Sequence, residues 1–143
     1  MPGITVGVDG SQHSRRALEW AIREAGLRGA PLTVLAVHQV ASNYWTGSAE
    51  HYAADAPATE AVRKAAEDAV QKAVSQVGDP GPTSVTVRAV SGLPAQELVS
   101  ASSDADLVVV GSRGGGGFAK LVLGSVANKV VSHAVSPVVV IRG

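Results

Sequence analysis

Cysteine is absent from this chain of 143 residues, and aromatic residues make up only 3% of it. The lack of cysteine excludes disulfides, thiol catalysis and zinc–thiolate sites. The scarcity of aromatic residues predicts an aliphatic core and argues against a stacking platform for single-stranded nucleic acid. The twelve basic and twelve acidic residues cancel. This balance also argues against nucleic acid as a main partner, because nucleic-acid surfaces carry a basic face or stripe.

Long hydrophobic runs are missing as well. No apolar run approaches the roughly 18 residues of a membrane span, and the N-terminus shows no signal-peptide pattern. A chain of this length fits one domain with a single core, so we expect one domain over residues 1–143. These features favour a cytoplasmic protein that binds neither membrane nor nucleic acid.

Aliphatic strand patterns alternate with amphipathic helix patterns along the chain. Strands are predicted over residues 4–8, 32–37, 85–89, 107–110 and 138–141. Helices are predicted from Ser11 or Ser14 to an end marked by Gly26 and Gly29, and over residues 58–77, 94–102 and 125–134. Residues 38–57 follow neither pattern. The alternation indicates an α/β domain, with a mostly parallel sheet that helices cover.

The strands at 4–8 and 107–110 are short and almost entirely aliphatic, which predicts central positions in the sheet. If they are neighbours, the chain leaves them toward opposite faces, and ligands bind at the carboxyl ends of such strands. Asp9-Gly10-Ser11 follows the first strand, and a glycine loop beginning at Gly111 follows the second. We therefore expect these two distant segments to converge on one pocket.

The glycine loop leads into a helix that begins near Gly124-Ser125. Glycines let backbone N–H groups approach a ligand, and a helix N-terminus adds unpaired donors and a positive dipole end. This arrangement predicts a phosphate site that includes the Ser125 hydroxyl. Leu121 follows the loop lysine, Lys120, so the loop is not a P-loop. No Asp or Glu follows the loop, which argues against a dinucleotide fingerprint.

The spacing Gly111-x-x-Gly114, nine residues and Gly124-Ser125 resembles the nucleotide motif of the universal stress protein family. The start Val6-Gly7-Val8-Asp9-Gly10-Ser11 and the end Ser136-Pro137-Val138-Val139-Val140 are similar to that family's first and last strands. The resemblance covers the whole chain. It implies a single flavodoxin-like, Rossmann-like α/β domain, with a five-stranded parallel sheet of order 3-2-1-4-5 and helices on both faces.

The resemblance also implies ATP binding, because the complete glycine motif is similar to that of the family's ATP-binding group. The loop after the first strand would face the nucleoside, and the backbone at the end of the second strand would border the adenine. The glycine loop would wrap the ribose and phosphates, and the following helix start would hold the phosphate end. The implied binding residues are Gly7, Asp9, Gly10, Ser11, Val37, His38, Gly111, Ser112, Arg113, Gly114, Gly115, Gly116, Gly117, Gly124, Ser125 and Val126.

Mg²⁺ or Mn²⁺ would be carried on the phosphates, and no metal-ligating or catalytic residue is expected in the protein. Family members commonly dimerise through their last strands. Residues 138–141 are apolar on both faces and carry no charge, yet they lie at the edge of the predicted sheet. Such an edge tends to pair with another chain, so we expect a homodimer through this strand.

Several alternatives remain open at the level of the sequence. The ligand could be AMP or cyclic AMP, or the chain could be an interaction module without a nucleotide. Asp9 could cap a helix, and Arg113 and Lys120 could be ordinary exposed charges. Tyr44, Trp45 and Tyr52 could form a pocket lid or pack over the sheet edge. We also expect Gly111→Ala to weaken binding without harming the fold, because its Cβ would enter the nucleotide's space.

Overall fold

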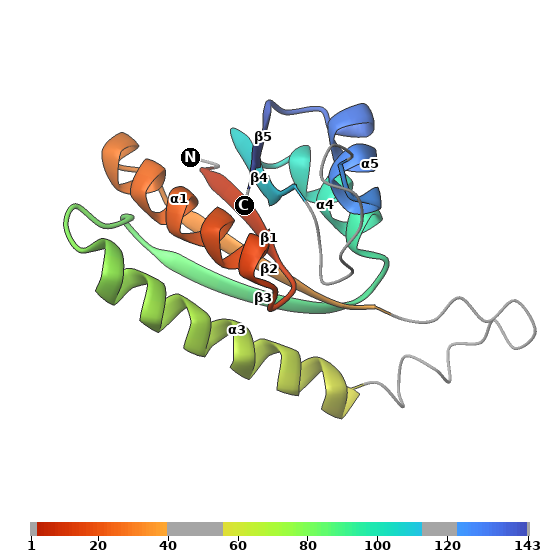
Figure 1. Cartoon of the computed structure of the whole chain (residues 1–143), viewed down its shortest axis with the longest axis horizontal. Coiled ribbons are helices and arrows are strands. Elements are labelled where there is room, and N and C mark those ends of the chain that lie inside the picture. Colours follow the sequence, from red (N-terminus) through yellow and green to blue (C-terminus); the bar gives the residue numbers. More distant parts are fainter. Residues whose placement is uncertain (1–2, 40–55, 113–122, 143) are drawn as a thin grey trace, which may run out of the picture.

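The structure is a computed structural model that describes residues 3–39, 56–112 and 123–142. Strands and helices alternate over these residues, as Figure 1 shows. In chain order they are β1 (Ile4–Val8), α1 (Gln12–Arg28), β2 (Leu32–Gln39), α3 (Ala56–Val77), β3 (Val85–Gly92), α4 (Pro94–Ser102), β4 (Leu107–Gly111), α5 (Ser125–His133) and β5 (Val138–Ile141). The strands form one parallel sheet of order β3-β2-β1-β4-β5, which confirms the predicted order.

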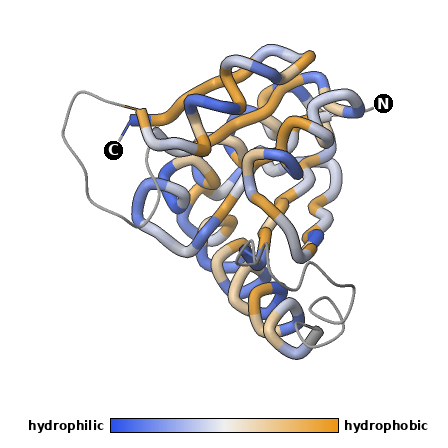
Figure 2. Tube along the Cα trace, turned by 90° about the vertical axis from the view of Figure 1, so that its right-hand side faces the viewer, coloured by the Kyte–Doolittle hydropathy of each residue, from blue (hydrophilic) through white to orange (hydrophobic). Residues whose placement is uncertain are grey.

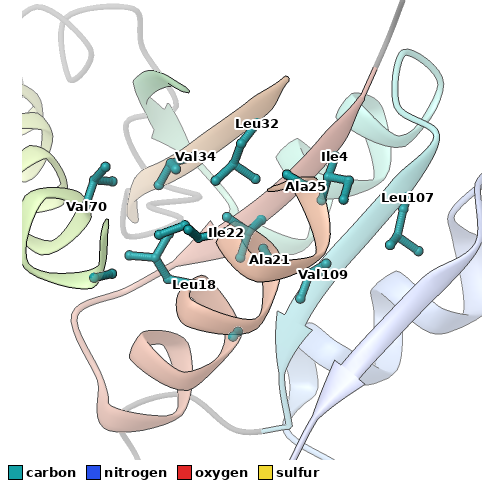
Figure 3. Packing of buried hydrophobic residues seen from close by; sticks show 13 residues of the cluster. Ile4, Leu18, Ala21, Ile22, Ala25, Leu32, Val34, Val70, Leu107 and Val109 are labelled. Atoms are coloured by element: carbon teal, nitrogen blue, oxygen red, sulfur yellow. The ribbon is translucent and has the colours of Figure 1, made fainter. Parts of the chain in front are cut away.

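Helices cover both faces of the sheet and produce three layers. Helices α1 and α3 pack on one face, against residues such as Ile4, Leu32 and Val109 (Figure 3). Helices α4 and α5 pack on the other face, against residues that include Val108 and Val110. Successive residues of β4 therefore face opposite layers, as the twofold period of a strand requires. The buried apolar side chains are Ile, Leu, Val and Ala, so the expected aliphatic core is confirmed for the described residues.

Local sequence signals explain where α1 begins and ends. The Ser11 side chain accepts a hydrogen bond from the Ser14 amide at 3.2 Å, which makes Ser11 the N-cap. At the other end Gly29 has φ +62° and donates its N–H to the carbonyls of Ala25 and Gly26. Glycine adopts this left-handed conformation without the steric cost that a Cβ would add. Of the two serines predicted to cap this helix, the structure selects Ser11.

Three predicted boundaries were wrong by a few residues. Strand β2 continues through His38 to Gln39, and β3 continues to Gly92, because the two strands stay paired up to Gln39 and Gly92. Backbone pairing rather than hydropathy decides where these polar strand ends stop. Helix α3 begins at Ala56, and Pro57 lies in its first turn, where its missing N–H costs nothing.

Strand β5 pairs with β4 alone and forms one edge of the sheet. Figure 2 shows hydrophobic colouring along the chain just before the C-terminus, at the border of the molecule. Each of the four β5 residues is only half-buried. Among the described helices, none combines the length and the apolar character needed to cross a bilayer.

Candidate nucleotide-binding site

The centre of the sheet is a topological switch point. Strand β1 pairs with β2 on one side and with β4 on the other. The chain leaves β1 for α1 on one face and leaves β4 for α5 on the opposite face. Ligands of open α/β sheets bind at the carboxyl ends of the two strands where the order reverses. The two segments that the sequence predicts to form the site follow the carboxyl ends of these adjacent strands, β1 and β4.

A closed set of hydrogen bonds shapes the turn that follows β1. The Ser11 amide donates to Asp9 Oδ1 at 2.8 Å, and the Asp9 amide donates to Ser14 Oγ at 3.2 Å. The Ser14 hydroxyl in turn donates to the Ser11 carbonyl at 3.0 Å. Asp9 thus supports the turn, while its side chain stays exposed at the strand end. A structural role and a ligand contact are compatible at this residue.

The end of β4 meets the first turn of α1 at Gly111. A Cβ built on Gly111 would stand 3.0 Å from the carbonyl carbon and oxygen of His13, and 3.1 Å from His13 Cβ. These contacts bring the segments after β1 and β4 together, as expected. They also correct our reason for glycine at this position, because an added Cβ would press on α1 rather than enter nucleotide space. Gly111→Ala would therefore disturb the fold as well as the site.

Backbone hydrogen bonds hold together the described residues on either side of the glycine loop. The Ser112 amide donates to the Ile141 carbonyl at 2.8 Å, and the Ser112 carbonyl accepts from the Gly124 amide at 2.7 Å. Gly124 is the N-cap of α5 and has no side chain with which to cap the helix. The Asn128 amide makes the first intrahelical bond, to the Gly124 carbonyl at 2.9 Å.

The first-turn amides of α5 therefore have no acceptor within the helix. Ser125 is exposed and Val126 is half-buried in this turn. The positive end of the helix dipole lies beside the end of β4, which is the environment that phosphate groups prefer. A phosphate group at Gly124, Ser125 and Val126, where the sequence predicts one, would meet these amides.

Strand β2 extends past the end of β1 next to the same place. The last β1 residue, Val8, pairs with Ala36, so β2 runs past β1 at Val37, His38 and Gln39. On its other side this extension pairs with β3. Among the described residues no strand covers the β1-facing edge beyond Ala36. The Leu32 amide donates to the Ser84 carbonyl on the β3 side, and backbone groups alternate sides along a strand. Val37 therefore directs its N–H and C=O groups toward the β1 side, where they can contact a base, whereas those of His38 point toward β3.

Two further glycines of the predicted site have different surroundings. A Cβ on Gly7 would lie 2.9 Å from Leu98 Cδ1, so close packing of α4 on β1 accounts for glycine there. Gly10 has φ +83°, and a Cβ on it would meet nothing within 4 Å. Backbone conformation rather than space requires glycine at this turn. Sequence reasoning missed the contacts from His13 and Leu98, since no local pattern shows which helix approaches which strand end.

Other predicted residues lie outside the described residues. These include the loop residues Arg113, Gly114, Gly115, Gly116, Gly117 and Lys120, and the aromatic residues Tyr44, Trp45 and Tyr52. Within the described ranges, no group of three or more His, Asp or Glu side chains is placed to hold a metal ion.

The sheet order and the helix start at its switch point define a Rossmann-like α/β domain of the nucleotide-binding kind. The model of the Universal stress protein family matches residues 2–142. The chain belongs to this family, and the resemblance seen in its glycine motif and terminal strands is confirmed.

Curated relatives support the same assignment. A universal stress protein of Mycolicibacterium smegmatis is 36% identical over 143 residues, which cover 99% of this chain and 48% of the relative. A universal stress protein of Mycobacterium tuberculosis H37Rv is 38% identical over 141 residues, covering 97% and 44%. The chain thus spans about half the length of the curated relatives that it matches.

Solved structures of the family share the fold. The universal stress protein UspA from Lactobacillus plantarum superposes with a TM-score of 0.78 at 26% identity, covering 98% of this chain and 97% of that one. A universal stress protein in complex with cAMP superposes with a TM-score of 0.68 at 28% identity, and the match covers 98% of this chain and 95% of that one. The universal stress protein from Archaeoglobus fulgidus in complex with dAMP superposes with a TM-score of 0.58 at 26% identity, and the match covers 99% of this chain and 97% of that one.

Proposed function

We propose that this chain is an ATP-binding universal stress protein, in which bound nucleotide regulates a stress response. The observation that supports this most directly is the uncapped start of α5 beside the end of β4. First-turn amides without an acceptor in the helix and a positive dipole end suit a phosphate chain. The complete Gly111-x-x-Gly114-x9-Gly124-Ser125 motif spans the same place in the sequence.

In this proposal the nucleotide lies across the carboxyl ends of the central strands. The base meets the end of β2 at Val37 and His38, and the ribose lies near the exposed Asp9 carboxylate. The phosphates lie between the glycine loop and the first turn of α5. Mg²⁺ or Mn²⁺ would be held by the phosphates and water, because hard cations keep several water ligands.

The site holds no general base paired with a positioned nucleophile among its described residues. We therefore propose a binding protein whose turnover of ATP is slow at most. Residues 1–143 would act as one domain in the cytoplasm, binding neither nucleic acid nor membrane.

A shorter nucleotide is the second candidate ligand. Two structures that share this fold were solved with cAMP and with dAMP, each carrying a single phosphorus. The backbone edge of β2 would contact the base of any adenine nucleotide in the same way. Contacts between the start of α5 and the β and γ phosphates would make ATP bind more tightly than these shorter ligands.

Isothermal titration calorimetry with ATP, ADP, AMP and cyclic AMP tests the proposal. We expect ATP with Mg²⁺ to bind most tightly, and we expect EDTA to weaken ATP binding more than AMP binding. Mass spectrometry of the denatured protein shows which nucleotide is purified with it. Neither heat nor a thermal shift with any of the four at millimolar concentration would refute nucleotide binding. If AMP or cyclic AMP bound more tightly than ATP, that nucleotide would be the ligand instead.

We also propose that two copies pair through β5. The strand carries no charge, and its four residues are half-buried. Val131 and Val135, which precede it, are 49% and 75% exposed. An uncharged edge strand flanked by exposed apolar side chains favours pairing with a second copy about a twofold axis.

A further inference from the structure

A groove lies between α4 and α5, on the face of the sheet opposite α1 and α3. Its volume is about 430 Å³, and its lining residues are Ala95, Gln96, Val99, Ser100, Lys129 and His133. Ala95 and Val99 are half-buried, whereas Lys129 and His133 are exposed and lie one helical turn apart on α5. The groove therefore combines an apolar base with a basic side.

Lys129 is the one side chain with a formal charge among the residues that line this groove. Lys129 takes part in none of the ion pairs found among the described residues. The acidic residue of α4, Glu97, directs its carboxylate toward Gly92, 3.2 Å from the position of a Cβ there. The groove thus attracts negatively charged groups.

The shape of the groove suits a helix better than a small molecule. Pockets for small ligands enclose most of the ligand surface, but Gln96, Ser100, Lys129 and His133 are all exposed here. Helices α4 and α5 each contain nine residues. At 1.5 Å per residue each measures about 13 Å, the length of a helical segment of about eight to ten residues. An amphipathic helix can lay its apolar side into such a groove.

We propose that the α4–α5 groove docks an acidic amphipathic helical segment of a partner protein. The apolar side of the segment contacts Ala95 and Val99, and its carboxylates lie beside Lys129 and His133. This surface is separate from the proposed nucleotide site, and its occupation does not require that site to bind ATP. The chain would thereby have a surface through which a regulator contacts its target.

Fluorescence polarisation with a labelled twelve-residue peptide tests this docking. The probe carries Leu at helical spacing and Glu elsewhere, and its control carries Lys in place of Glu. We expect saturable binding of the Glu peptide and at least about tenfold weaker binding of the Lys peptide. Gln96→Glu and Lys129→Glu should each weaken the Glu peptide about tenfold by charge repulsion. Gln96 is the third residue of α4, where a carboxylate also favours the helix.

Helix α3 provides matched controls. A depression of about 440 Å³ there is lined by Gln71, Lys72, Ser75 and Gln76. Lys72→Glu and Gln71→Glu make the same charge changes without an apolar base, so peptide affinity should stay within about twofold. Circular dichroism shows whether each variant is folded. If Lys129→Glu does not fold, the peptide affinity of Gln96→Glu decides the test. Absent binding, unchanged affinity in the groove variants, or equal loss in the α3 variants overturns the proposal. ATP titrations on the same proteins report separately on the nucleotide site.

Discussion

Close packing and backbone conformation place different demands on the glycines around the site. At Gly7 and Gly111 another element occupies the space of a side chain, from Leu98 of α4 and from His13 of α1 respectively. At Gly10 the space is open, but φ is +83°. A substitution therefore tests a different property at each position, and its effect on nucleotide binding must be separated from its effect on folding.

Gly7→Ala should lower the free energy of unfolding, by about 1–3 kcal/mol, because the buried Leu98 side chain must move to admit the Cβ. Gly81→Ala is the control, since a Cβ there meets nothing within 4 Å and Gly81 has no positive φ. This variant should be as stable as the parent or slightly more stable. Thermal denaturation measures both, and equal melting temperatures would contradict the packing account of Gly7.

Variants of Asp9 distinguish its role in the turn from a contact with the ligand. Asp9→Asn keeps an oxygen that can accept from the Ser11 amide, so the melting temperature should stay close to that of the parent. Asp9→Ala removes this acceptor and should also lose affinity for ATP about tenfold, the loss expected for a hydrogen bond to a charged group. Calorimetry and thermal denaturation of both variants provide the comparison. If Asp9→Ala bound ATP as the parent does, Asp9 would serve only the turn.

Among the elements, α5 links the proposed phosphate site to the body of the domain. Ala127 and Val130 anchor it in the core, while its N-terminus lies beside Ser112 at the end of β4. The helix has neither a capping side chain nor an acidic residue in its first turn. A helix start left without these stabilising groups is suited to an anionic ligand, which would supply the missing interactions.

Ser125→Asp should therefore change stability and binding in opposite directions. A carboxylate at the start of α5 favours the helix dipole and should raise the free energy of unfolding by about 0.3–1 kcal/mol. The same charge should repel the phosphates and weaken ATP binding by at least about tenfold. Ser132→Asp, near the C-terminal end of α5, should lower stability and leave ATP affinity unchanged. Unchanged affinity in Ser125→Asp would place the phosphates elsewhere.

At the scale of the whole molecule, the two edges of the sheet differ. Strand β3 has an exposed cation, Arg88, and α3 packs against it, which protects this edge from pairing. Strand β5 has no charge along its length. Of these two edges, β5 is thus the one that no charge protects, and this asymmetry supports the proposed closed pair over an open chain of molecules.

Disruption of the β5 edge should convert the proposed dimer to monomer. The Pro137 and Ile141 carbonyls accept from the Val108 and Ser112 amides, so alternate residues of β5, Val138 and Val140, direct their N–H groups away from β4. Val140→Pro removes one of these outer N–H groups and should yield monomer. Val135→Glu places a charge beside β5 and should weaken the dimer, whereas Leu27→Glu on α1 should leave it intact. The pair is matched, because Val135 and Leu27 are 75% and 72% exposed. Light scattering behind a sizing column measures the mass, and a parent monomer at tens of micromolar excludes the dimer.

The sequence by itself determined the α/β class and the order of elements, and it limited the N-cap of α1 to Ser11 or Ser14. Periodicity and capping act over a few residues, so residue types such as Ser11 and Gly29 report them directly. The two central strands could be recognised because strands buried on both faces are aliphatic throughout. From these strands the convergence of Asp9 with the start of the glycine loop followed.

Only the tertiary structure decided the contacts between distant elements. Pairing with Gly92 carries β2 to Gln39, past the end of β1, where the base is proposed to bind. Packing of α4 and α1 explains Gly7 and Gly111, and the same packing of α4 beside α5 creates the basic groove. These features depend on how rigid elements approach one another across the sheet. No local pattern carries that information, because the contacting residues lie far apart in the chain.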